Sequence, residues 1–107
     1  MNSHILVLNY NGQHLLAECL PSIVAAAREV SDCAVSVVDN GSVDSSLEWL
    51  HRNWPEITVF RCSNQGLASF NTVVKKINTS IVFLLNNDVK LAPGFVNSGA
   101  RAVFCVL

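Results

Sequence analysis

The sequence predicts an α/β fold with three layers, α/β/α, in which helices cover both faces of a mostly parallel sheet. Two observations lead to this prediction: short apolar runs alternate with longer stretches of helical periodicity, and several apolar runs end abruptly in polar residues. The resulting β-α-β-α-β-α-β order is typical of parallel strands joined by right-handed crossovers. With 107 residues, the chain is long enough for one small domain, which we expect to span residues 1–107.

The first half of the chain is expected to contribute two strands and two helices. Residues 5–8 and 34–38 are apolar runs typical of buried strands, and large aliphatic residues recur at helical spacing over residues 15–24. Pro21 lies inside that helical stripe and predicts a kink or a broken first turn there. Ser45 and Glu48 have the spacing of a capping box, so a second helix is expected to start near Ser45.

The second half continues the alternation. Residues 57–60 and 81–85 predict two further strands, with a helix over residues 67–77 between them. The second of these strands runs into Asn86, Asn87 and Asp88, where apolar side chains give way to two amides and a carboxylate. Polar groups at the carboxyl end of a parallel strand lie where open α/β sheets bind ligands. Asp88 is therefore placed for ligand or metal chemistry.

Composition and charge exclude several functional classes. Hydrophobic residues make up 50% of the chain and charged residues 14%, which argues against disorder. The net charge of −1 provides no basic surface that would attract nucleic acid. A transmembrane helix needs about 20 apolar residues, and every apolar run in the sequence is far shorter. The cysteines are scattered, which favours a reduced, cytoplasmic setting; they are Cys19, Cys33, Cys62 and Cys105. The histidines are isolated from one another and are expected on the surface; they are His4, His14 and His51.

Polar clusters follow three of the predicted strands, at residues 9–12, 39–42 and 86–88. Because the carboxyl ends of parallel strands share one edge of a sheet, these clusters are expected to converge there. Together they offer the ring of Tyr10, the carboxylates of Asp39 and Asp88, and several amides, which suits a nucleotide and a cation that bridges its phosphates. Taken singly, each cluster is also an ordinary turn sequence, so a structural interpretation stays open for each.

Motifs for other kinds of nucleotide or nucleophile chemistry are missing from the sequence. It has no G-x-G-x-x-G after the first strand, no Walker A run and no G-x-S-x-G elbow. A nucleotidyltransferase would need a glycine-rich, basic triphosphate loop after the first strand, whereas Asn11-Gly12-Gln13 stands there. The sequence therefore disfavours a dinucleotide fold, a P-loop and a serine nucleophile.

Five blocks of sequence stand in an order and spacing that resemble one enzyme family. The blocks are VLNYNG (7–12), CLPS (19–22), VVDNGSVD (37–44), NQGLA with Asn71 (64–71), and FLLNNDV followed by PGF (83–95). Covering roughly residues 4–95, they are similar to the N-terminal, donor-binding half of an inverting family 2 glycosyltransferase of the rhamnosyltransferase-like kind. The resemblance implies a GT-A fold, whose nucleotide-binding half is Rossmann-like.

The resemblance also implies a nucleoside-diphosphate-sugar donor and roles for residues at the predicted edge. Asp88 would coordinate Mg²⁺ or Mn²⁺ on the donor diphosphate, and Asn86, which replaces the first carboxylate of the family's D-x-D motif, would contribute only weakly. Asp39 would bind the base or ribose, whereas Asp44 would either face the donor or cap a helix. The residues expected to bind the nucleotide sugar are Asn9, Tyr10, Asn11, Asp39, Asn40, Gly66, Asn71, Asn87 and Asp88.

By the same resemblance, the complete enzyme would transfer a sugar to a glycan or lipid-linked acceptor, in the cytoplasm or at the inner face of the membrane. The family's acceptor half and its general base, the carboxylate that deprotonates the acceptor hydroxyl, have no match in these residues. We therefore expect no catalytic residue in this chain and no transfer by the chain alone. The alternative is a catalytically inactive fragment or small interaction domain, which would self-associate through exposed faces.

Overall fold

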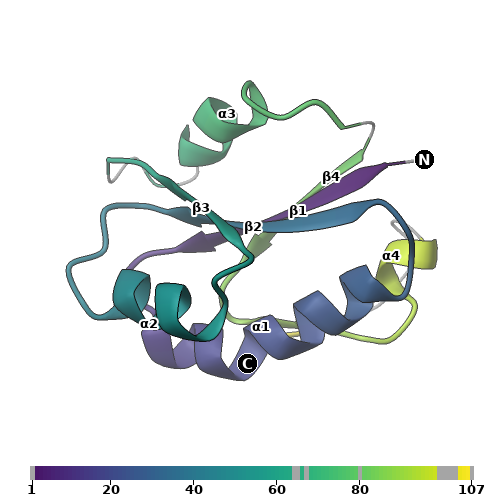
Figure 1. The fold of residues 1–107 in the computed structure, drawn as a ribbon, viewed down its shortest axis with the longest axis horizontal. Coiled ribbons are helices and arrows are strands. Elements are labelled where there is room, and N and C mark those ends of the chain that lie inside the picture. The colour runs from purple at the N-terminus through teal and green to yellow at the C-terminus, as the bar shows by residue number, and fades with distance from the viewer. Residues whose placement is uncertain (1, 64–65, 67, 80, 99–103, 107) are drawn as a thin grey trace.

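A parallel four-stranded sheet forms the centre of the computed structural model, which describes residues 2–63, 66, 68–79, 81–98 and 104–106 (Figure 1). The strands lie in the order β3-β2-β1-β4, and every neighbouring pair is parallel. β1 is thus an inner strand with almost every residue buried, as its apolar sequence predicts. The strands are β1 (Ser3–Asn9), β2 (Cys33–Asp39), β3 (Thr58–Arg61) and β4 (Ile81–Asn86).

Helices cover both faces of this sheet. The three that connect the strands are α1 (Gln13–Arg28), α2 (Ser46–Asn53) and α3 (Ala68–Val74). α1 and α2 lie against one face and α3 lies against the other (Figure 1). The predicted three-layer α/β/α fold is therefore confirmed. Within the described ranges, no helix combines the length and the apolar character that a bilayer crossing requires.

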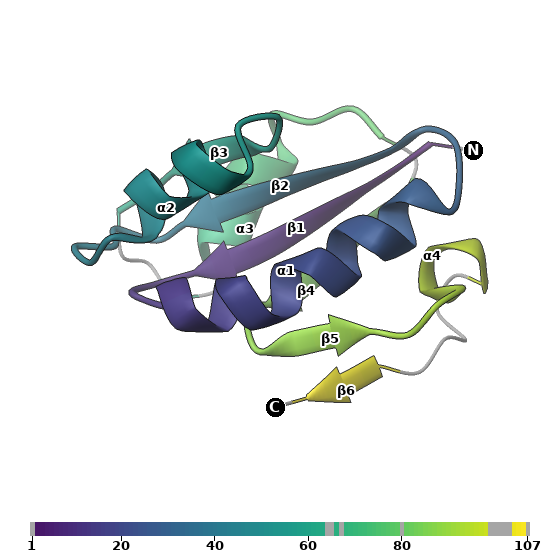
Figure 2. The same ribbon diagram turned by 60° about the horizontal axis from the view of Figure 1, so that its bottom comes forward.

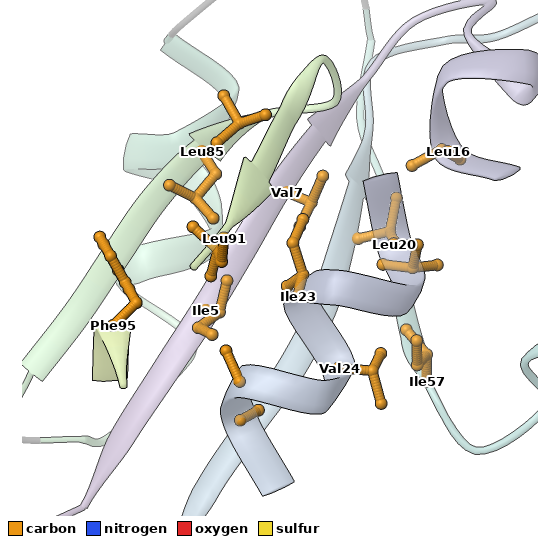
Figure 3. Close-up of a cluster of buried hydrophobic side chains, with 14 of the residues drawn as sticks. Ile5, Val7, Leu16, Leu20, Ile23, Val24, Ile57, Leu85, Leu91 and Phe95 are labelled. Carbon is orange, nitrogen blue, oxygen red and sulfur yellow. The ribbon is translucent and has the colours of Figure 1, made fainter. Parts of the chain in front are cut away.

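Each face of the sheet has its own hydrophobic core. The larger core lies between α1 and the sheet (Figure 3), where Leu20 and Ile23 of the helix are fully buried together with Ile5 and Val7 of β1. The smaller core lies between the sheet and α3, and it contains Leu6, Val38, Phe70 and Val73. Alternate residues of β1 thus serve opposite faces, which fixes the register of the strand.

α1 continues through Pro21 without ending, so the expected break does not occur. A proline in a helix interior removes one backbone hydrogen bond and costs about 3 kcal/mol. Seven residues of α1 are buried, and their contacts with the sheet offset this cost. Pro21 itself is exposed, so its ring displaces nothing in the core.

The chain after β4 crosses to the α1 side of the sheet. β5 (Val89–Leu91) pairs antiparallel with β6 (Phe104–Val106) in a separate two-stranded sheet beside α1, and α4 (Phe95–Ser98) lies between them in the chain (Figure 2). The Leu91 N–H donates to Ser22 Oγ of α1 at 3.1 Å. The abrupt end of β4 at Asn86 thus creates the turn that carries residues 87 and 88.

His4 is buried, which corrects the expectation that it lies on the surface; His14 and His51 are exposed as expected. β1 begins two residues earlier than the apolar run suggests, so His4 lies within the central strand with 9% of its surface exposed. Its Nε2 is 2.8 Å from Ser36 Oγ on β2. Burial disfavours the imidazolium and lowers the pKa of His4 from the usual value of 6.5.

The lowered pKa of His4 predicts a loss of stability on acidification. Below the ordinary pKa the unfolded chain binds a proton that the folded chain resists, so the free energy of unfolding falls as pH drops from about 7 toward the folded pKa. One proton limits the slope to about 1.4 kcal/mol per pH unit. Urea unfolding of wild type and His4→Gln across this range is expected to show a shallower slope for the variant. His51→Gln, at an exposed position, should keep the wild-type slope; an unchanged slope in His4→Gln would contradict the assignment.

Candidate functional site

The carboxyl ends of β1, β2 and β4 meet at one edge of the sheet, as the sequence predicts. In the strand register, Asn9 lies beside Asp39, and Leu8 lies beside Asn86. The Asn40 N–H donates to the Asn9 carbonyl at 2.8 Å, which extends the pairing of β1 and β2 into the loops that follow. Polar clusters that are up to about 80 residues apart in sequence are therefore neighbours in space.

Asn9 lies at the centre of this edge and has no exposed surface (0%). Its Nδ2 donates to Asp39 Oδ1 at 3.1 Å and to Ser42 Oγ at 3.2 Å, while its Oδ1 accepts from Asn87 Nδ2 at 2.8 Å. Asp39 is 1% exposed, and its Oδ2 accepts from the Ser42 backbone N–H at 2.9 Å. Asn9 and Asp39 thus form a buried floor under the edge, and a direct contact of either with a ligand stays a prediction.

Asn11 joins the loop after β1 to the loop after β2. Its backbone has a φ of 48°, a left-handed conformation that asparagine tolerates better than most residues. Its Oδ1 accepts from the backbone N–H of Val43 at 2.7 Å and of Asp44 at 3.2 Å, and its own N–H donates to Ser42 Oγ at 2.9 Å. Asn11 therefore shapes the two loops as one unit, whatever it contributes to ligand binding.

Asp44 caps a helix, which is one of the two roles expected for it. Its Oδ1 accepts from the Ser46 N–H at 2.9 Å and its Oδ2 from the Gln13 N–H at 3.4 Å, so it serves the first turns of α2 and α1. Burial alone would raise the pKa of Asp44, but hydrogen bonds from Ser46 and Gln13 outweigh it and lower the pKa. The expected capping box is wrong: the N-cap Ser45 makes no side-chain hydrogen bond, and Glu48 pairs with Arg52 at 2.9 Å.

Asn40 connects the loop after β2 to the start of α3. It is 3% exposed, its Oδ1 accepts from Ser69 Oγ at 2.6 Å, and its Nδ2 lies 3.4 Å from the Gly66 carbonyl oxygen. Gly66 has a φ of +61°, which glycine adopts without strain. Asn40 and Gly66 are thus brought together as structural partners at this edge.

Two serines that were not among the predicted site residues complete these networks. The Asp39 side chain accepts from the backbone N–H three positions later, a turn pattern that local sequence predicts for any residue at position 42. The Ser42 hydroxyl instead accepts from Asn9 and Asn11, which are more than 30 positions away in sequence, so no local signal selects this serine. Ser69 offers only the hydroxyl of an ordinary residue near a helix start, and its bond to Asn40 depends on how α3 packs on the sheet. Tertiary packing, rather than local sequence, selects Ser69.

Other predicted site residues lie on open parts of the edge. Tyr10 keeps 47% of its surface exposed at the end of the central strand, so its ring is accessible to a ligand. Asn71 of α3 and Asn86 of β4 line one hollow of about 580 Å³, together with Ala68, Phe70, Leu84 and Leu85. The structure therefore brings Asn71 and Asn86 together, on the α3 side of the sheet rather than beside Asn9.

Asp88 is half-buried in the turn between β4 and β5, next to Asn87. In the described part of the chain no cluster of three or more His, Cys, Asp or Glu residues could hold a metal by itself. One carboxylate with neighbouring amide oxygens is an all-oxygen donor set, and Mg²⁺ is often bound through one or two carboxylates plus substrate phosphates. These residues fit a cation that is shared with a diphosphate.

The sequence matches a family model. The model described as Glycosyl transferase family 2 covers residues 4–103. None of the curated proteins matches the sequence significantly. The family match therefore covers nearly the whole chain: it includes the turn at Asp88 and, apart from Ser3 at the start of β1, every strand of the parallel sheet.

Solved structures share the fold. The mannosyltransferase PcManGT from Pyrobaculum calidifontis, in complex with GDP-Man and Mn²⁺, has a TM-score of 0.72 and 21% identity, over 87% of this chain and 29% of its own. TarS from S. aureus in complex with UDP-GlcNAc has a TM-score of 0.75 and 22% identity, over 92% of this chain and 30% of its own. This chain thus spans less than a third of the length of either structure.

Proposed function

Since the chain belongs to glycosyl transferase family 2, we propose that it is the donor-binding part of an enzyme that moves a sugar from a nucleoside-diphosphate sugar to a glycan or lipid-linked acceptor. One observation carries the proposal. The ends of β1, β2 and β4 bring Tyr10, Asp39 and the Asn87–Asp88 turn to one edge of the sheet. A ring, a carboxylate and a second carboxylate are the groups that a base, a ribose and a metal-bound diphosphate need.

In this proposal the loops after β1 and β2 bind the nucleoside. The exposed ring of Tyr10 stacks on the base. Asp39 has lone pairs left over from its two internal hydrogen bonds, but it is 1% exposed, so its contact with the base or ribose requires the loops above it to open. Asn11 and Asn40 support the walls of the site, because each bonds a neighbouring loop. The sugar end of the donor then lies toward Gly66 and Asn71.

The diphosphate is assigned to the turn after β4. Asp88 would hold Mg²⁺ or Mn²⁺ there, with Asn87 beside it and with Asn86 as a weaker contributor. When bound, the cation offsets the negative charge that builds up on the departing nucleoside diphosphate. The role of the chain's own residues is to bind and orient the donor.

The general base that activates the acceptor is assigned to a part of the enzyme outside these residues. At this edge Asp39 and Asp44 already accept hydrogen bonds from the protein, and Asp88 is assigned to the cation.

Cys19, Cys33 and Cys62 are free thiols, which supports a reduced, cytoplasmic setting, including the inner face of a membrane for a lipid-linked acceptor.

Titration calorimetry with UDP, GDP and dTDP, each with and without Mn²⁺, tests the proposed function. At least one diphosphate is expected to bind, and Mn²⁺ should raise its affinity. The matching monophosphate serves as the control, because it keeps the base and ribose but lacks the second phosphate that the cation bridges. Absence of binding by all three diphosphates, in the presence and absence of Mn²⁺, would refute the proposal.

We also propose that the chain self-associates through β4. β4 is an edge strand among the described residues, and Leu84 on it is 50% exposed. An unpaired strand edge with an exposed leucine favours pairing with another chain. Light scattering after size-exclusion chromatography should give a mass above the monomer for wild type and the monomer mass for Leu84→Lys, whereas Val43→Lys, at an exposed loop position, should resemble wild type. A monomeric wild type at every concentration would contradict this.

A further inference from the structure

We propose that Asp39, acting through Asn9, determines which end of the Asn87 carboxamide faces the ligand. The inference rests on the proposed function for the identity of that ligand, whereas the orientation of Asn87 follows from the hydrogen bonds alone. Asn9 is then a positioning residue. Its side chain bonds both Asp39 on β2 and Asn87 in the turn after β4, two residues that are 48 positions apart in the chain. The acceptor character of Asp39 therefore sets the orientation of both amides.

The first step is the orientation of Asn9. Both oxygens of Asp39 accept hydrogen bonds, Oδ2 from the Ser42 backbone N–H and Oδ1 from Asn9. A carboxylate has no proton to donate, so the group of Asn9 that faces it has to be the Nδ2 amide. With its surface fully buried, Asn9 has no water to satisfy the opposite arrangement.

The second step is the orientation of Asn87. Because Asn9 Nδ2 faces Asp39, Asn9 Oδ1 faces Asn87 and requires a donor, which Asn87 Nδ2 supplies at 2.8 Å. Gly12 leaves the room for this contact, because a Cβ at position 12 would lie 2.0 Å from Asn87 Nδ2. Asn87 Oδ1 accepts no hydrogen bond from the described residues and remains the available end of the carboxamide.

The consequence concerns the chemistry beside Asp88. An outward oxygen adds a neutral ligand, or a hydrogen-bond acceptor, on the residue that precedes Asp88 in the turn, whereas an outward NH₂ at this position would repel a cation. Partners that orient metal ligands without touching the metal are a general feature of such sites, and their loss costs about 10- to 100-fold in metal affinity. Asn9 and Asp39 are assigned this task for Asn87.

A pair of variants reverses and then restores this chain of hydrogen bonds from Asp39 through Asn9 to Asn87, which we call the relay. In Asp39→Asn the side-chain oxygen at position 39 still accepts from the Ser42 N–H, so the new NH₂ group faces Asn9. The Asn9 carboxamide is then expected to turn over, and the Asn87 oxygen to turn inward. In Asn9→Asp/Asp39→Asn the carboxylate moves to position 9, where it accepts from both position 39 and Asn87. The double variant keeps the wild-type charge and returns Asn87 Oδ1 to the outside. Asp32→Asn, in an exposed turn, makes the same chemical change away from the edge.

Two measurements test the relay. NMR is expected to show an Overhauser effect between the Asn87 side-chain NH₂ and the Gly12 Hα protons in wild type and the double variant, but not in Asp39→Asn. Binding of Mn²⁺ with inorganic pyrophosphate, followed by electron paramagnetic resonance, should fall about 10- to 100-fold in Asp39→Asn and recover in the double variant. Pyrophosphate carries no base, so any contact of Asp39 with a nucleoside does not affect this readout.

The outcomes separate the inference from the proposed function. If wild type shows no Overhauser effect between the Asn87 NH₂ and Gly12, the inference is overturned without any variant. It is also overturned if the double variant does not recover both the Overhauser effect and the wild-type binding of Mn²⁺–pyrophosphate. If wild type binds no Mn²⁺–pyrophosphate, the diphosphate site fails; the loss and recovery of the Overhauser effect then decides whether the relay exists. If Asp39→Asn does not fold, the folded double variant with both wild-type signals supports the relay.

Discussion

Replacing Asp88 by asparagine is expected to remove most of the Mn²⁺-dependent binding of a nucleoside diphosphate. The change is nearly isosteric, but among the described residues of this edge it takes away the one carboxylate that accepts no hydrogen bond from the protein, since Asp39 and Asp44 both do. Loss of a residue that only orients a metal ligand lowers metal affinity about 10- to 100-fold, and loss of a direct ligand should lower it at least as much. Calorimetric titration of UDP with Mn²⁺ and with EDTA measures the metal-dependent share of the affinity.

The controls for Asp88→Asn separate the cation from the nucleoside. Affinity in EDTA should be unchanged in the variant, because Tyr10 and Asp39 are assigned to the nucleoside. Asp32→Asn, at an exposed left-handed turn (φ 64°), should bind like wild type in both conditions. If Asp88→Asn keeps the full effect of Mn²⁺, Asp88 is not a ligand and the assignment of the diphosphate to this turn is wrong.

The fold followed from patterns that are local in the sequence. Apolar runs predicted all four strands of the parallel sheet, and their alternation with helical segments predicted the crossovers. The differences arise where tertiary contacts override local preference. β1 includes His4 because Ser36 on the neighbouring strand supplies a partner, and α1 passes through Pro21 because its apolar face is held on the sheet.

The site was predictable in position but not in its hydrogen bonding. Strand ends in a parallel sheet converge, so the clusters around Asn9, Asp39 and Asn87 could be placed at one edge from the sequence. Which amide faces which carboxylate depends on residues 30 and 78 positions apart in sequence, a relation that no local pattern contains. The same applies to Asp44, which takes the capping role that local spacing assigned to Ser45.

Gly12→Ala is expected to disturb both stability and the diphosphate side of the site. Gly12 has a φ of −117°, which any residue can adopt, so the constraint is one of space rather than of backbone conformation. A Cβ would lie 2.0 Å from Asn87 Nδ2 and 2.8 Å from Asn9 Oδ1. Asn87 would be displaced, and the buried Asn9 Oδ1 would lose its donor, at a cost of about 1–3 kcal/mol. Urea unfolding measures the first effect, and UDP titration with Mn²⁺ measures the second.

A double-mutant cycle with Asn87→Ala isolates the cause of the Gly12→Ala effect. Alanine is also a poorer N-cap than glycine, and α1 begins right after Gly12, so part of the loss arises at the helix terminus. That part is the same in both backgrounds, whereas crowding against the Asn87 amide exists only where the amide is present. Gly12→Ala should therefore cost clearly less in the Asn87→Ala background. Strict additivity of the two changes would mean that Gly12 is required by the helix start alone, and that the contact between the first and fourth strand ends does not depend on it.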